Sequence, residues 1–537
     1  MKQILLILVV SILVISCQEK EKSDFIIINS NTYTVNNNFD KAQSFAIKDG
    51  KFIAVGTNEE IQKKYTSLQT VDAKNKTIVP GLIDAHCHFY RLGLQQQKVD
   101  VSGTKSYDEV LERLVAFQKE KNTSFITGRG WDQNDWDLKE FPTKEKLDIL
   151  FPKTPVAITR VDGHALLVNQ AALDISGITN TSKTSGGEFI KKDGKLTGVL
   201  IDNAMKFIKT PNPTKREKIQ ALLDAQKISF SYGLTTVDDA GLSKETLELI
   251  DSLHNTNDLK IRIYGMVSLS DKHLDYYLNK GIIKTNRLNI RSFKVYGDGA
   301  LGSRGAAMKE SYSDRKDHFG AMIYSPEKYV EVARRIANSE FQMNTHAIGD
   351  STNYWILKTY KNVLKGKKDR RWRIEHAQII APEDFNMFEN ILPSIQPTHA
   401  TSDMYWAKDR VGKERMKGAY AYKDLLNIYG KVALGTDFPV EKVSPFLTFY
   451  ASTIRKDLEN YPENGFQTEN ALTREETLKG MTIWAAYSNF EEKEKGSIEV
   501  GKFADFIILN QNIMEVKGNE IPNTKVVATF INGEKVK

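Results

Sequence analysis

The key stretch of the chain is Val79-Pro80-Gly81-Leu82-Ile83-Asp84-Ala85-His86-Cys87-His88, in which a Pro-Gly turn leads into a short apolar run that ends in two histidines. Side chains alternate between the two faces of a strand, so His86 and His88 are expected on one face and Cys87 on the other. Two imidazoles that project together from the end of a buried strand can bind a metal ion. A lone His-x-His is more often a pair of polar loop residues, so a metal site needs further ligands elsewhere in the chain.

Four later runs of apolar and β-branched residues supply such ligands. They are Lys294 within residues 293–299, His346 at the end of 341–346, His376 at the end of 372–376 and Asp437 at the end of 431–437. Histidine is scarce, with nine in the whole chain, yet four of the nine end a run of this kind. This clustering favours a metal site over a chance match.

Between residues 79 and 490, strand-like runs alternate with amphipathic helical patterns, which is typical of an α/β fold with a parallel sheet or barrel. We expect eight strands, at residues 82–88, 234–239, 261–267, 292–295, 341–346, 373–376, 392–396 and 432–437. Eight is the strand number of the (β/α)8 TIM barrel, whose active sites lie at the C-terminal ends of the strands. A doubly wound open sheet also fits the alternation, but it does not explain why candidate ligands end the first, fourth, fifth, sixth and eighth strands.

Five motifs together resemble those of the amidohydrolase superfamily of metal-dependent hydrolases. They are residues 80–88 (PGLIDAHCH), 298–304 (DGALGSR), 346–350 (HAIGD), 374–377 (IEHA) and 435–439 (GTDFP). Within the superfamily, the chain is similar to the amidohydrolase 3 branch, which holds N-substituted formamide deformylases. The resemblance implies a TIM barrel, a centre for divalent metal ions and a carboxylated lysine that bridges two ions at the end of the fourth strand.

The ligand set predicts the metal and the chemistry. Imidazoles and carboxylates on a rigid barrel suit Zn²⁺ or a similar divalent ion, and we expect one or two ions. His86, His88 and Asp437 are expected to hold one ion, and His346 and His376 a second. A divalent ion lowers the pKa of bound water to about 7, which makes hydroxide available at neutral pH. Asp437 is also the expected general acid/base, which passes a proton from the water to the leaving nitrogen.

Lys294 needs a separate explanation, because metal ions repel a free ammonium in a pocket of low dielectric constant. Carboxylated on its side-chain nitrogen by CO₂, it becomes a bridging ligand and part of the catalytic centre, as the resemblance implies. The alternative is a lysine whose stem packs in the barrel and whose ammonium pairs with an acid such as Asp298. His399, which follows the seventh strand, is a further candidate for catalysis and substrate binding.

Both ends of the chain predict short β-strands, within residues 25–78 and 491–537. Neither end has enough strands for a stable sheet, so we expect the two to join in one small β-sandwich domain that flanks the barrel of residues 79–490. Residues 124–204 are too long for a connection after the first barrel strand and predict an inserted subdomain over the barrel mouth. Within it, Trp131 and His164 are candidates for the substrate pocket, or they only hold the insertion together.

The first 16 residues predict a secretory signal peptide, because one lysine precedes an apolar run too short to span a membrane. Residues 14–17 (VISC) resemble the lipobox of bacterial lipoproteins, which implies cleavage before Cys17 and acylation of its thiol. Residues 17–24 then form a tether, and we expect a lipid-anchored protein of the cell envelope, on the outer membrane. The alternative is an ordinary signal peptide with an incidental cysteine. With Cys17 acylated, Cys87 stays alone and no intramolecular disulfide can form.

The formal charge of +7 comes from 75 basic and 68 acidic residues without long runs of one sign, which gives no reason to expect nucleic-acid binding. The leading hypothesis is a hydrolase of a non-peptide C–N bond in an amide-like small molecule, such as an N-formyl or N-acyl amine. One alternative keeps the site for an ester, lactone or cyclic imide. Another is a catalytically inactive, lipid-anchored solute-binding protein, which would have no use for Asp437 as a proton shuttle. The expected partners are a small-molecule substrate and, through Cys17 alone, a membrane; a homo-oligomer stays open.

Overall fold

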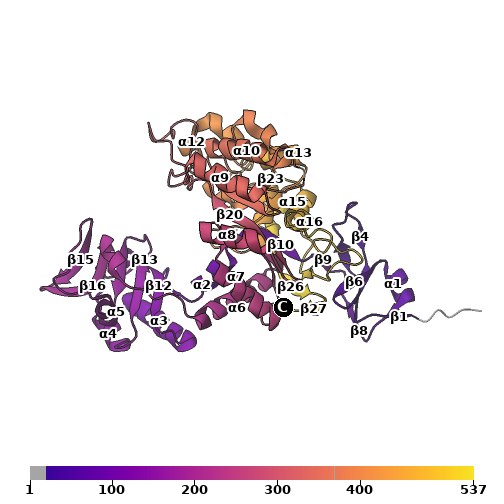
Figure 1. Ribbon diagram of the computed structural model, residues 1–537. Coiled ribbons are helices and arrows are strands. Elements are labelled where there is room, and N and C mark those ends of the chain that lie inside the picture. Colours follow the sequence, from indigo (N-terminus) through magenta and orange to yellow (C-terminus); the bar gives the residue numbers. More distant parts are fainter. Residues whose placement is uncertain (1–19, 368) are drawn as a thin grey trace, which may run out of the picture.

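The computed structural model describes residues 20–367 and 369–537. The predicted signal peptide and Cys17 lie outside these residues, as does the first part of the predicted tether. The described chain forms a central barrel, a β-sandwich on one side of it and an inserted α/β unit on the other (Figure 1). Within the described ranges, none of the helices combines the length and the apolar character that crossing a membrane requires.

Eight parallel strands form the barrel in sequence order, and all eight predicted strands are among them. They are β10 (Leu82–Cys87), β17 (Leu234–Leu242), β18 (Arg262–Ser268), β20 (Leu288–Tyr296), β21 (Gln342–Ala347), β22 (Arg373–His376), β23 (Leu392–Ile395) and β24 (Ala433–Leu434). The ring closes just beyond β24, where the Asp437 N–H donates to the His86 carbonyl (2.8 Å) and the His88 N–H donates to the Phe438 carbonyl (2.7 Å). The predicted α/β fold with a TIM barrel is therefore confirmed.

Helices cover the outside of the barrel. They are α2 (Phe89–Gln95), α6 (Lys215–Ser231), α7 (Lys244–Asn255), α8 (Asp271–Lys280), α9 (Pro326–Ala337), α10 (Asp350–Leu364), α11 (Pro397–Asp403), α12 (Ala407–Arg415), α13 (Tyr422–Tyr429), α14 (Pro445–Ile454), α15 (Arg474–Gly480) and α16 (Ile483–Ser488). Helices α6 to α9 start at Thr214, Ser243, Ser270 and Ser325, whose hydroxyls accept a hydrogen bond from the N–H three residues on. Such N-caps satisfy amides that the helix leaves unpaired and set where each helix begins.

Both ends of the chain build the β-sandwich. One sheet has the order β6-β5-β2-β8 and the other β27-β26-β25-β9-β3-β4. The strands are β2 (Phe25–Ile28), β3 (Asn31–Tyr33), β4 (Lys41–Ala42), β5 (Ser44–Lys48), β6 (Lys51–Gly56), β8 (Gln69–Asp72), β9 (Thr77–Pro80), β25 (Phe506–Leu509), β26 (Val526–Ile531) and β27 (Glu534–Lys535). Phe506 packs between the sheets, 5.1 Å from the ring of Phe45 and 4.3 Å from that of Phe530. The predicted joining of the two chain ends is thus present in the fold.

A buried ion pair fastens the sandwich to the barrel. Arg262 of β18 donates to both carboxylate oxygens of Asp505, with Nε–Oδ2 and Nη2–Oδ1 distances of 2.6 and 3.0 Å. Both side chains are almost fully buried. A bidentate pair of this kind has a defined geometry, so it fixes the orientation of the two domains where they meet.

The inserted unit contains its own sheet, in the order β11-β12-β13-β14-β16-β15. Its elements are β11 (Val99–Asp100), α3 (Tyr107–Lys121), β12 (Ile126–Trp131), α4 (Glu145–Leu150), β13 (Val156–Arg160), β14 (Ala165–Val168), α5 (Gln170–Ser176), β15 (Gly187–Lys192) and β16 (Lys195–Asp202). The unit begins at β11, before the predicted residue 124, because β11 pairs with β12 and α3 packs on the same core. It extends sideways from α2 and α6 (Figure 1), and none of its residues lines the cavity at the barrel mouth, over which it was predicted to lie.

Candidate metal centre

The first two ligand candidates stand at the end of β10. His88 follows the strand directly and occupies the N-cap position of α2. The Nε2 atoms of His86 and His88 lie 3.8 and 3.3 Å from Oδ1 of Asp437, which follows β24 on the adjacent side of the closed ring. One ligand atom from each of the three residues falls within 4.8 Å of the others. This is the three-residue set that the sequence predicts for one metal ion.

Local contacts hold β10 and the end of β24 together at this point. The carboxylate of Asp84 accepts hydrogen bonds from the Thr436 N–H (3.0 Å) and from its hydroxyl (2.7 Å). A side chain at Gly435 would place its Cβ 2.4 Å from the backbone nitrogen of His86, so only glycine fits there. Asp437 itself has a positive φ of 62°, a strained conformation that such surroundings can maintain at functional sites.

Three further imidazoles face this set from β21, from β22 and from α11. The ring of His376 lies 4.6 Å from that of His346, 4.8 Å from that of His86 and 5.8 Å from that of His399. His376, His399 and Asp437 form a second set whose ligand atoms lie within 4.8 Å of one another. The structure therefore places His399, as well as the predicted His346, next to His376.

The donor atoms of this cluster fit a divalent metal ion. Nε2 of His346, Nδ1 of His376 and Oδ1 of Asp437 are buried without a hydrogen-bond partner. Burial lowers the pKa of His86 to about 4 and that of His346 to about 3, so both imidazoles are neutral at pH 7, as a metal ligand must be. Buried polar atoms are normally paired, and a cation would satisfy all three.

Lys294 of β20 lies in the same cluster, with 1% of its surface exposed. Its Nζ is 3.2 Å from Nε2 of His86, and burial lowers the pKa of the ammonium. Within the described part of the chain, no carboxylate forms an ion pair with it. The alternative partner considered above, Asp298, accepts instead from the backbone N–H groups of Ala307, Ile348 and Gly349. The structure thus offers Lys294 no structural partner of that kind.

Glu375 is the main residue of the site to which the sequence alone assigned no role. Its Oε2 accepts a hydrogen bond from Nδ1 of His86 at 2.5 Å, and both side chains are buried. Burial opposes ionisation, but the contacts with His86 hold the pKa of Glu375 down to about 2. Because the hydrogen bond to Glu375 keeps the proton of His86 on Nδ1, the Nε2 atom of His86 keeps its lone pair for a metal ion. The signal in the sequence was a glutamate inside a buried strand, which is rarely found without a partner.

A cavity of about 450 Å³ contains the cluster. Its walls include the six predicted metal ligands and His399, and the other polar or aromatic side chains around it are Arg91, Tyr296, Gln378, Asp403, Trp406 and Glu441. Oε1 of Glu441 lies 3.3 Å from Nδ1 of His399, whose Nε2 lies 3.3 Å from Oδ2 of Asp437. Although burial opposes it, hydrogen bonding to Asp437 and Glu441 raises the pKa of His399 to about 10. His399 thus links two carboxylates as an imidazolium.

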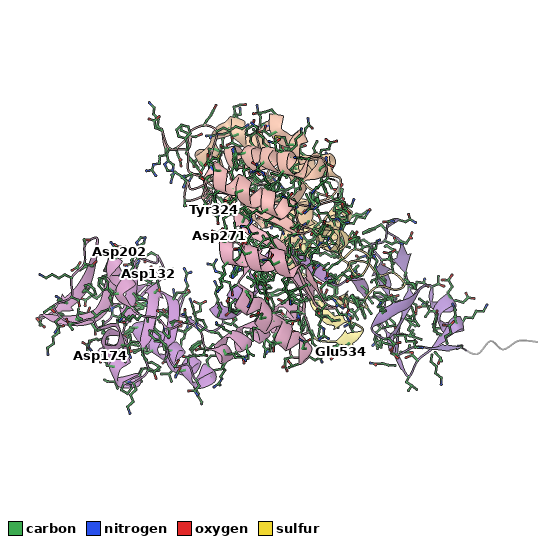
Figure 2. The ribbon with its side chains drawn as sticks, in the orientation of Figure 1. Asp132, Asp174, Asp202, Asp271, Tyr324 and Glu534 are labelled. Atoms are coloured by element: carbon green, nitrogen blue, oxygen red, sulfur yellow. The ribbon has the colours of Figure 1, made fainter. Side chains whose placement is uncertain are left out.

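Trp131 and His164, the two pocket candidates from the insertion, do not line this cavity. Trp131 is fully buried in the core of the inserted unit, and its indole N–H donates to the Ile158 carbonyl (2.8 Å). His164 is exposed, and its Nδ1 pairs with Asp202 at 2.7 Å. Asp202 stands at the upper edge of the inserted unit in Figure 2, away from the barrel. The structure therefore places Trp131 in the core of the insertion and His164 on its surface, and it brings neither to the cavity of the metal centre.

Comparison with known proteins agrees with this fold and site. The amidohydrolase family matches residues 69–537. A protein of Arabidopsis thaliana named LONG AFTER FAR-RED 3 is 32% identical over 96% of the chain and 91% of its own length. An N-substituted formamide deformylase of Arthrobacter pascens is 25% identical over 95% of the chain and 97% of its own length. The fold also matches the crystal structure of an uncharacterized metal-dependent hydrolase from Pyrococcus horikoshii. The match covers 92% of this chain and 99% of the hydrolase, with 26% identity and a TM-score of 0.75.

The barrel and the histidine–aspartate cluster at its mouth define a metal-dependent hydrolase. The chain belongs to the amidohydrolase family. The predicted superfamily and the predicted requirement for a divalent metal ion agree with this membership.

Proposed function

We propose that the protein hydrolyses a non-peptide C–N bond in a small amide, such as an N-formyl or N-acyl amine. The observation that carries this proposal is the buried cluster at the barrel mouth, where unpaired imidazole and carboxylate atoms surround a buried lysine. The formamide deformylase of Arthrobacter pascens, which matches the chain over nearly its full length, supports the same class of bond.

His86, His88 and Asp437 would hold one divalent ion, which we propose to be Zn²⁺. His376 and His346 would hold a second, and His399 lies beside His376. The ions would activate a water molecule at neutral pH and polarise the scissile carbonyl.

Lys294 would supply the ligand between the two ions. Its buried amine has a lowered pKa, so a larger fraction is neutral and able to attack CO₂. The nitrogen forms a bond to the CO₂ carbon and loses one proton, which leaves a carboxylate on Nζ. That product exchanges an unfavourable buried ammonium for an anion among cations and imidazoles.

Asp437 and His399 would move the protons. Burial opposes ionisation of Asp437, but the hydrogen bond from His399 holds its pKa well below the usual range, so it is ionised and free to accept a proton. Asp437 takes a proton from the attacking water and returns it to the leaving nitrogen. The His399 imidazolium, held by Glu441, lies beside Asp437 and can donate a hydrogen bond to the substrate.

We also propose that the protein is anchored to the cell envelope by a lipid on Cys17. Residues 14–17 support this, because Cys17 stands two residues after the end of the apolar run, separated from it by Ser16. The expected partner of the barrel is a small molecule and not a nucleic acid.

The experiment that tests the activity combines metal analysis with a substrate screen. The purified protein should contain one or two zinc ions per chain and should release amine from N-formyl or N-acyl amines. His86→Ala and His88→Ala should lose tightly bound metal and activity together, since each variant lacks a direct ligand. Full metal content in both variants would contradict the assigned site, and activity on esters alone would contradict the assigned bond.

A further inference from the structure

The interior of the barrel carries charged side chains one layer below the metal centre. Barrel interiors are usually filled by branched apolar residues, so charges in this place need an explanation. Arg373 of β22, Asp238 of β17 and Asn489, which directly follows α16, are fully buried there. Side chains alternate along a strand, so Arg373 lies on the same face of β22 as Glu375, two residues nearer the start of the strand. The charged layer therefore lies directly beneath Glu375.

Arg373, Asp238 and Asn489 form a closed ring of hydrogen bonds. Nη1 of Arg373 donates to Oδ2 of Asp238 (3.0 Å), and its Nη2 donates to Oδ1 of Asn489. Nδ2 of Asn489 donates in turn to Oδ1 of Asp238 (2.7 Å). A planar guanidinium that is held at two of its nitrogens has a defined orientation. The ring therefore fixes the position of the positive charge of Arg373 inside the barrel.

Arg373 approaches the metal centre through two contacts. Its Nη1 also donates to the carbonyl of Ala85 (3.2 Å), the residue that precedes His86 in β10. The same Nη1 lies 3.9 Å from Oε1 of Glu375, a buried oxygen without a hydrogen-bond partner. In the described part of the chain, Arg373 and His86 alone bring a basic nitrogen within 4.0 Å of the Glu375 carboxylate. Because a guanidinium is always charged, Arg373 is the nearest permanent positive charge to Glu375.

We propose that Arg373 is a positioning residue of the metal centre, whose charge holds the carboxylate of Glu375 in place behind His86. The inference rests on the proposed metal centre and adds a residue to it. A buried carboxylate without a cation beside it is strongly destabilised. Without Arg373, Glu375 is no longer held at Nδ1 of His86, and Nε2 of His86 becomes a weaker ligand for a metal ion.

The test changes Asp238 together with Arg373, so that it measures metal binding in a stable protein. Removal of Arg373 alone leaves two buried carboxylates without their permanent cation, and breaking a buried ion pair on one side is strongly destabilising. Asp238→Asn keeps the shape of that side chain and removes its charge. Arg373→Lys and Arg373→Met are then compared in the Asp238→Asn background, because the new side chains have similar lengths and differ in charge.

Zinc affinity is measured by competition with a chromophoric chelator, and stability by urea unfolding of the metal-free protein. Asp238→Asn/Arg373→Met should bind zinc at least about tenfold more weakly than Asp238→Asn, and Asp238→Asn/Arg373→Lys should recover most of this loss. If the methionine variant does not fold, the equally uncharged Arg373→Gln replaces it. Equal zinc affinities of the charged and uncharged variants, both folded, would overturn the inference.

A double-mutant cycle tests whether Arg373 acts through Glu375. In a protein that already carries Asp238→Asn and Glu375→Gln, the further change Arg373→Met should weaken zinc binding less than about twofold, because the carboxylate that Arg373 positions is gone. A loss as large as the one in the presence of Glu375 would overturn the inference. Arg373 would then act by another route, such as its hydrogen bond to the Ala85 carbonyl.

Arg455→Met is the matched control for the loss of a buried arginine. Arg455 is fully buried as well, and its hydrogen bonds go to the Tyr420 and Phe466 carbonyls and to the Gln467 side chain, none of which is a proposed metal ligand. Arg455→Met should lower the free energy of unfolding and leave zinc affinity unchanged. An equal loss of zinc affinity in this control would show that burial of any arginine has the effect, and would overturn the inference.

The same measurements separate this inference from the proposed function. If the original protein binds no zinc, the proposed metal centre fails and this inference fails with it. If zinc binds as expected but no amide is hydrolysed, the proposed function fails, and the difference between the lysine and methionine variants still supports the role of Arg373. If amides are hydrolysed and these two variants bind zinc equally, the inference fails alone.

Discussion

Replacing Glu375 by glutamine removes one negative charge from the buried contact with His86 and keeps the shape of the side chain. The pKa of Glu375 is about 2 against a usual 4.5, a difference that corresponds to about 3 kcal/mol between its two protonation states. Part of this energy comes from the hydrogen bond between the carboxylate and Nδ1–H of His86. That bond keeps the proton on Nδ1 and leaves Nε2 available as a ligand. Substitutions behind metal-ligating histidines typically weaken metal binding 10- to 100-fold, or about 1.4 to 2.7 kcal/mol. We expect Glu375→Gln to fall in that range.

The assay is zinc competition with a chromophoric chelator at pH 7.5, together with urea unfolding of the metal-free protein. Glu248→Gln is the matched control, because Glu248 lies on the surface in α7 and, among the described residues, its only ion pair is with Lys244. The control should bind zinc as the original protein does. A zinc affinity of Glu375→Gln within twofold of the original, in a folded protein, would refute the role given to this hydrogen bond.

Four further outcomes are expected. Lys294→Ala should lose activity and one bound ion together, and short carboxylic acids should restore part of the activity by supplying bridging oxygens; metal analysis that finds an unchanged count removes Lys294 from the centre. Cys17→Ser should move the protein from the membrane fraction to the soluble fraction, and a variant that stays with the membrane contradicts the lipid anchor. Burial lowers the pKa of His86 from 6.5 to about 4, so in metal-free protein the unfolded imidazole is protonated first and stability falls as the pH drops below 6.5. Metal-free His86→Asn should therefore lose about 2 kcal/mol less than the original protein between pH 7 and pH 5 in urea unfolding, and equal losses argue against a neutral His86. Asp505→Ala leaves Arg262 buried without its partner and should lower the free energy of unfolding by about 3 to 5 kcal/mol, whereas a loss under 1 kcal/mol would show that the ion pair does not hold the domains together.

The barrel was predictable because its strands are short apolar runs separated by amphipathic helices, and both patterns depend on local sequence. The start of the insertion was not, because β11 has only two residues and α3 has the pattern of an ordinary barrel helix. Only its packing on the core of the inserted unit assigns α3 to that unit. The direction in which the insertion extends depends on where α2 ends and α6 begins in space. The hydrophobic periodicity of the sequence does not predict these positions.

The clustering of the candidate metal ligands was predictable for a related reason. Parallel strands end at the same edge of a barrel, so residues such as His86, His376 and Asp437 meet there wherever they lie in the sequence. The neighbours of the ligands were harder to foresee. Glu441 follows the last strand by several residues, and its contact with His399 depends on how α11 is placed. Trp131 could not be placed from the sequence, because its burial in the core of the insertion depends on contacts with residues far along the chain.

The β-sandwich has a consequence for how the chain is made. In its second sheet, Ile78 of β9 pairs with Ile508 of β25, about 430 residues later. At synthesis rates of about 5–20 residues per second, β9 waits roughly 20 to 90 s for its neighbour to emerge. During that time Phe25 and Phe45 lack the cover of β25 and β26, the strands of the second sheet that carry Phe506 and Phe530. A nascent chain with this topology keeps apolar surface exposed until its last strands arrive, and a chain that stops short of β25 leaves the edge of β9 unpaired.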